Sequence, residues 1–111
     1  MNVTRSQQGR VAILAVHGPL VGEELDGLDS QVDECVNAGL FKVVLDLGQT
    51  PFIDSAGLER LQSIVSDLGK RGGDLRVAAL NDVCQDIFWA TRMESFVQVF
   101  ADRESAIRSL L

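Results

Sequence analysis

The sequence is poor in the side chains that most often carry out catalysis or bind metal ions. Its 111 residues include one histidine (His17), no tyrosine and two cysteines, Cys35 and Cys84. Two cysteines cannot form a disulfide framework, nor can they alone supply the four ligands of a structural zinc site. This inventory disfavours an enzyme, and it predicts neither a metal site nor a bound cofactor.

Basic residues and long apolar runs are also scarce. Ten Lys and Arg residues stand against sixteen Asp and Glu residues, which gives a formal net charge of −6. An acidic surface repels nucleic-acid phosphates and anionic lipid headgroups, so neither is an expected partner. The longest strongly apolar run, residues 11–16, is far shorter than the roughly 20 residues that cross a bilayer, so no membrane insertion is expected. Because the amino terminus lacks a secretory signal and the thiols are free, the expected location is cytoplasmic.

Strand-like and helix-like segments alternate along the chain. Two strands, at 3–6 and 11–17, flank a turn-like stretch and predict an antiparallel hairpin. The remaining segments predict helices at 22–38, from about 54–58 to 71, at 82–91 and from 103 onward, and strands at 41–47, 75–80 and 96–100. This order predicts one α/β domain, residues 1–111, with a mixed, mostly parallel sheet of four to five strands and about four helices.

The third helix has a distinct predicted start and inner face. Asp82, with a glutamine three residues later, reads as a capping box. The spacing of Val83, Ile87 and Ala90 predicts that these three side chains face inward. Asp102 is expected to be the N-cap of the last helix.

Five further residues have simple structural interpretations. His17 is expected to be a turn residue, and Cys35 and Cys84 are expected to be core thiols. Phe88 and Trp89 are predicted to pack between helix and sheet. If either is exposed, it marks a second contact surface.

The segment Asp54-Ser55-Ala56-Gly57-Leu58 follows a buried strand and opens a helix. Ser55, or Asp54, is a natural N-cap, and this structural interpretation is common. A functional interpretation is that Ser55 accepts a phosphoryl group, which free amides and the helix dipole would favour. Gly57 in the first turn is costly relative to alanine, and a close approach by another backbone would justify that cost.

Two carboxylates, Asp46 and Asp54, could suggest a metal-binding pair of the kind found in phosphoryl-transfer enzymes. Asp46, however, lies within a strand between two leucines, and no third acid or partner lysine has an obvious place. The pattern therefore predicts no metal site.

With these motifs the chain resembles the STAS domain family, and within it the free-standing anti-sigma factor antagonists. The resemblance rests on the strand VVLDL at 43–47, the segment FIDSAGL at 52–58 with its D-S-x-G-L core, GGDLRV at 72–77, and the closing segment 96–106. The element order extends it over the whole chain. One departure is Thr91-Arg92-Met93, where the family often has a Thr-Gly-Leu turn.

The resemblance implies a partner-switching regulator that catalyses nothing itself. The unphosphorylated chain would bind an anti-sigma factor that is also a GHKL-type serine kinase. Phosphorylation of the motif serine would end the interaction, and a PP2C-type phosphatase would restore it. By position, Ser55 is the phosphoacceptor, and the docking surface comprises Gly22, Glu23, Glu24, Asp54, Ser55, Ala56, Gly57 and Leu58. The resemblance leaves a weak homodimer open.

Two other function classes stay open from the sequence. One is a STAS module with a structural role in a transporter or signalling scaffold, with Ser55 only a helix cap. The other is a small enzyme or nucleotide-binding protein, which the absence of a glycine-rich phosphate loop with a lysine disfavours.

Overall fold

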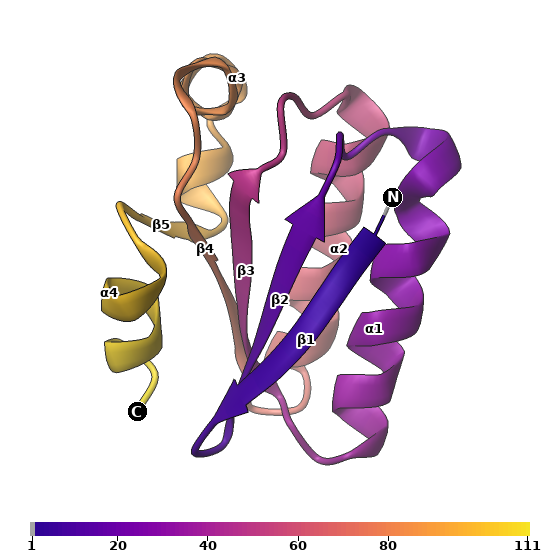
Figure 1. Ribbon diagram of the computed structural model, residues 1–111, viewed down its shortest axis with the longest axis vertical. Coiled ribbons are helices and arrows are strands. Elements are labelled where there is room, and N and C mark those ends of the chain that lie inside the picture. Colours follow the sequence, from indigo (N-terminus) through magenta and orange to yellow (C-terminus); the bar gives the residue numbers. More distant parts are fainter. Residues whose placement is uncertain (1) are drawn as a thin grey trace.

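The structure is a computed structural model that describes residues 2–111. It is built around a five-stranded sheet (Figure 1). In chain order the elements are β1 (Asn2–Gln8), β2 (Val11–His17), the 3-10 helix η1 (Gly22–Glu24), α1 (Leu25–Asn37), β3 (Lys42–Gln49), α2 (Ser55–Gly69), β4 (Asp74–Ala78), α3 (Asp82–Thr91), the 3-10 helix η2 (Met93–Ser95), β5 (Gln98–Phe100) and α4 (Arg103–Arg108). The predicted α/β class, strand number and helix number are confirmed.

The strands lie in the order β1-β2-β3-β4-β5. β1 runs antiparallel to β2, with Gln8 opposite Val11 beside the turn, and the other neighbours pair in parallel. This confirms the predicted hairpin and mixed sheet. Because β2, β3 and β4 are parallel, their carboxyl ends share one edge, and the loops into η1, α2 and α3 all begin there.

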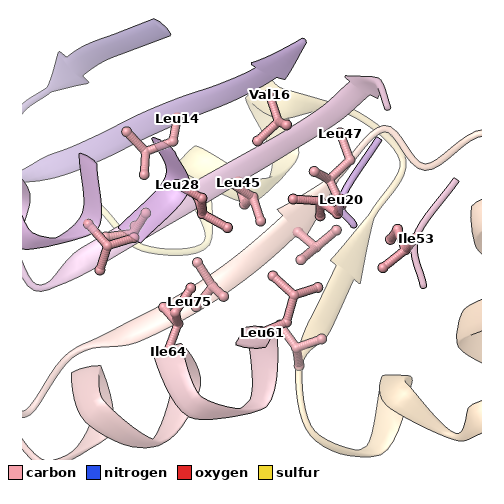
Figure 2. Close-up of a cluster of buried hydrophobic side chains, with 14 of the residues drawn as sticks. Leu14, Val16, Leu20, Leu28, Leu45, Leu47, Ile53, Leu61, Ile64 and Leu75 are labelled. Atoms are coloured by element: carbon pink, nitrogen blue, oxygen red, sulfur yellow. The ribbon is translucent and has the colours of Figure 1, made fainter. Parts of the chain in front are cut away.

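The helices cover both faces of the sheet (Figure 1). Alternation along β3 shows the division: Val43, Leu45 and Leu47 belong to the large core beneath α1 and α2, whereas Val44 belongs to a smaller cluster beneath α4. Figure 2 shows part of the large core, in which side chains of β2 and β3 lie on the side of the sheet that α2 covers with Leu61 and Ile64. Burial on both faces explains why β3 reads as a nearly continuous apolar run.

The start of α3 differs from the prediction. Asn81, not Asp82, is the N-cap, because its backbone is extended and its Oδ1 accepts a hydrogen bond from the Cys84 amide at 2.8 Å. Its Nδ2 also donates to the carbonyl of Pro51 at 3.2 Å. One asparagine thus caps α3 and ties it to the loop before α2, whereas Asp82 is already helical.

The inner face of α3 was also predicted wrongly in part. Cys84 and Phe88 are buried, and Ile87 is half-buried, whereas Val83 and Ala90 are exposed. The helix presents only a narrow stripe to the core, because it lies beyond the ends of β3 and β4 rather than across a face of the sheet (Figure 1). Asp102 caps α4 as predicted, since its Oδ1 accepts from the Ser105 amide at 2.7 Å.

The last strand is shorter than predicted, because residues 93–95 form η2 and pairing begins only at Gln98. Arg92 ends α3 in the left-handed conformation (φ 60°, ψ 29°), and its amide donates to the carbonyls of Phe88 and Trp89. Met93 is buried. Arg92 therefore occupies a left-handed position of the kind that glycine favours after a helix.

Replacing Arg92 by glycine is expected to raise the free energy of unfolding by a few tenths to about 1 kcal/mol. Glycine adopts the left-handed conformation without the steric cost that a Cβ carries, and this gain exceeds its larger unfolded-state entropy. Urea unfolding of Arg92→Gly measures the effect, with Arg92→Ala as the matched control that keeps the Cβ. Equal stability of the two variants would contradict the assigned turn.

Candidate functional site

Ser55 is the first residue of α2, and its side chain is exposed. The N-cap is Asp54, whose backbone is extended and whose Oδ1 accepts from the Gly57 amide at 2.8 Å. Of the two capping residues that the sequence left open, the structure selects Asp54. The Ser55 hydroxyl makes no hydrogen bond to any other residue within 2–111, so Ser55 does not cap the helix.

Asp54 also joins two segments that lie far apart in the sequence. Its second oxygen, Oδ2, accepts from the Gly22 amide of η1 at 3.2 Å. The Leu20 amide donates to the Phe52 carbonyl, and the Asp54 amide donates to the Leu20 carbonyl, both at 3.1 Å. The β2–η1 connection is therefore held against the start of α2.

Gly57 makes this close approach sterically feasible. A Cβ at this position would lie 2.3 Å from the Leu20 carbonyl oxygen and 2.9 Å from Cγ2 of Ile53. Real Cβ atoms do not approach other atoms so closely, so only glycine fits here without movement. The sequence prediction that another backbone approaches Gly57 is confirmed.

The eight predicted docking residues divide by exposure. Gly22, Glu23 and Ser55 are exposed, Glu24, Asp54 and Ala56 are half-buried, and Gly57 and Leu58 are buried. Leu58 belongs to the large core, so its expected partner contact is corrected to core packing. Gly57 likewise positions the loop rather than presenting a surface. The Glu24 carboxylate oxygen Oε2 is buried and unpaired among the described residues.

Three acidic residues lie near Ser55 in the chain or in the neighbouring η1. Glu23 lies in η1, Asp54 precedes Ser55, and Glu59 follows it one helical turn later. The positive end of the helix dipole partly offsets this charge. The site combines a free hydroxyl with an acidic border.

The other residues singled out in the sequence have structural partners or lie in the core. Asp46 forms an ion pair with Arg103 (Oδ2 to Nε, 2.9 Å), and its Oδ1 accepts from the Gly48 amide. Within residues 2–111 no three His, Cys, Asp or Glu side chains are grouped to hold a metal ion. Cys35 and Cys84 are buried as predicted, and burial raises the pKa of each thiol. His17 lies at the exposed end of β2, with Nε2 3.3 Å from the Thr4 hydroxyl.

Sequence reasoning missed two residues beside the site and misplaced a third. Asn81 fastens the loop before α2, and its place directly before a helix was the available signal. Phe52 is exposed three residues before Ser55. Trp89 is exposed rather than packed against the sheet, although Phe88 is buried as predicted.

No helix in the described part of the chain is long and apolar enough to cross a membrane.

Comparison with known proteins identifies the family. The sequence pattern of the STAS domain matches residues 2–106. The chain belongs to the STAS domain family. A curated relative is BtrV of Bordetella bronchiseptica, named as a provisional anti-sigma factor antagonist, which is 26% identical over 106 residues that cover 96% of this chain and 91% of BtrV.

Solved structures share the STAS fold of this chain. An anti-sigma factor antagonist from Mycobacterium paratuberculosis superposes with a TM-score of 0.87 at 19% identity, covering 98% of this chain and 92% of that one. The phosphorylated form of the Bacillus cell fate determinant SpoIIAA superposes with a TM-score of 0.74 at 13% identity, covering 99% of this chain and 100% of that one. At these identities the likeness concerns the fold alone.

Proposed function

We propose that this STAS domain is an anti-sigma factor antagonist controlled by phosphorylation of Ser55. The unphosphorylated domain binds an anti-sigma factor that is also a GHKL-type serine kinase, and phosphorylation releases it. A PP2C-type phosphatase restores binding, all in the cytoplasm and without catalysis by the domain itself. The observation that carries the proposal is the Ser55 hydroxyl at the start of α2 (residues 55–69), which is exposed and makes no hydrogen bond within residues 2–111.

The site is suited to accept a phosphate without rearrangement. The Gly57 amide already donates a hydrogen bond to Asp54, but the amides of Ser55 and Ala56 make no hydrogen bond within the described chain. Unpaired amides at a helix start bind phosphoryl oxygens, and the dipole adds about 0.3–1 kcal/mol at an exposed position. The charge of Asp54 and Glu59 opposes this gain, so the net effect on the free domain is small.

The main effect of phosphorylation is therefore exerted on the complex. A phosphate adds about 1.5–2 negative charges and considerable bulk within the docking surface. A partner packed against Ser55 would have to bury this charge, which is costly without a new basic partner. The names of the relatives support an anti-sigma factor as that partner.

Phosphate transfer tests the proposal. The chain is incubated with ATP and each purified GHKL-type serine kinase of its source organism, and the modified residue is located by mass spectrometry. We expect one phosphate, on Ser55, and none on Ser55→Ala. Ser63→Ala, which removes another exposed serine of α2, serves as the control and should be phosphorylated as the wild type is. Undiminished phosphorylation of Ser55→Ala would refute the assignment.

A further inference from the structure

Two large aromatic side chains are exposed where α3 ends and β5 begins. Trp89 is 77% exposed, and Phe96, just beyond η2, is 56% exposed. Their neighbours Phe88 and Met93 are buried and anchor the backbone of this segment. The core therefore does not need Trp89 or Phe96, and exposed aromatic groups on a rigid support are typical of binding surfaces.

One contact ties the segment between Trp89 and Phe96 to the face of α2 that carries Ser55. Ser55, Glu59 and Gln62 follow at spacings of four and three residues, so they share one side of the helix. Gln62 Nε2 lies 3.5 Å from the sulfur of Met93, as its hydrogen-bond donor. Met93 lies between Trp89 and Phe96 in the chain, so this contact holds the backbone that carries both aromatic residues beside the helix face that carries Ser55.

The charge around this surface indicates what kind of partner fits it. The segment 82–96 carries Asp82, Asp86 and Glu94 against Arg92, and Glu59 adds a further acid on α2. A second copy of the chain would bring the same acidic border and a second net charge of −6. A partner with basic groups around an apolar recess is complementary both to the exposed aromatic rings and to the acidic charge around them.

We propose that Trp89 and Phe96 are the second anchor of the docking surface that contains Ser55. The occupant is the anti-sigma factor kinase itself, which inserts the two rings into an apolar recess bordered by Lys or Arg. This inference rests on the proposed function and adds a contact at the far end of the surface. It also explains how phosphate at one end can release a partner that is held at two places, because loss of one contact weakens the whole interface.

Calorimetric titration tests the inference, with the kinase that phosphorylates Ser55 and a non-hydrolysable ATP analogue. Trp89→Ala and Phe96→Ala are each expected to weaken binding roughly 10- to 100-fold, as truncation of aromatic anchors does. Trp89→Phe should recover part of the loss. Val83→Ala is the matched control, because Val83 is also on α3 and 53% exposed but lies on another side of the helix. Unchanged thermal midpoints would show that the variants fold normally.

Three outcomes would overturn the inference. Wild-type affinity of both Trp89→Ala and Phe96→Ala would remove the second anchor while leaving the function of Ser55 intact. Self-association of the wild type that Trp89→Ala abolishes, with kinase binding unchanged, would assign the surface to a second copy; analytical ultracentrifugation detects this. Failure of every kinase to bind the wild type would overturn the proposed function and this inference with it.

Discussion

Replacing Gly57 by alanine is expected to lower the free energy of unfolding by about 1–3 kcal/mol, the cost of overpacking a closely packed site. The added Cβ would lie 2.3 Å from the Leu20 carbonyl oxygen, which is backbone and cannot rotate away. Relief requires the β2–η1 connection to move off the start of α2. Because that connection leads into η1, which carries Gly22 and Glu23, partner binding should fall together with stability.

Gly69 provides the matched control for this substitution. It lies at the other end of the same helix, and a Cβ there would meet no atom within 4 Å. Gly69→Ala should therefore leave the structure unchanged and stabilise the helix by up to about 1 kcal/mol. Urea unfolding of both variants measures the difference. If Gly57→Ala is as stable as the wild type, the close approach of Leu20 to α2 is not a feature of the folded protein.

Replacing Asp54 by alanine is expected to lower the free energy of unfolding by about 2–4 kcal/mol. Loss of the cap accounts for about 0.5–2 kcal/mol, and loss of the charged acceptor for the Gly22 amide accounts for about 1.5–3 kcal/mol. The expected total lies within the combined range of these two costs. The start of α2 would lose its cap, and η1 would lose its side-chain link to it.

Asp102 separates the two contributions of Asp54. It is also an aspartate N-cap, with Oδ1 2.7 Å from the Ser105 amide, but among residues 2–111 its other oxygen joins no second segment. Asp102→Ala should therefore cost only the capping contribution. Asp54→Asn, which keeps one oxygen acceptor, should lie between the wild type and Asp54→Ala. Urea unfolding gives all three values, and equal losses for Asp54→Ala and Asp102→Ala would mean that the Gly22 contact contributes nothing.

The sequence was sufficient for the architecture and for the reason that Gly57 is present. Apolar runs bounded by turn residues marked the strands, and period-3.6 patterns marked the long helices, because these elements bury one face or both. Gly57 was interpretable because glycine in a first helical turn has a known cost, which needs a compensating contact. Such reasoning depends on local chemistry, and local chemistry is what a sequence displays.

The choice between Asp54 and Ser55 could not be made in this way. Both residue types cap helices well, and they are adjacent, so local preference does not separate them. Asp54 is the better cap in the folded structure because its carboxylate accepts from two amides at once, those of Gly57 and of Gly22, which lies 32 residues away. The same limit applies to Asn81, whose amide reaches the Pro51 carbonyl.

The exposed Trp89 was mispredicted for a related reason. Large aromatic residues are usually buried to a high degree, and Trp89 directly follows Phe88, which is buried. Neighbouring residues on a helix point about 100° apart, so a narrow contact with the core can include only one of the two. How narrow that contact is depends on where α3 sits on the sheet.

The most direct test of the account compares one affinity before and after phosphorylation of Ser55. The chain is phosphorylated to completion, and its Kd for the kinase is measured by calorimetry beside that of the unmodified chain. We predict that phosphate weakens binding on the order of 100-fold or more, because the partner must bury an unpaired charge. Equal affinity of the two forms would contradict the account.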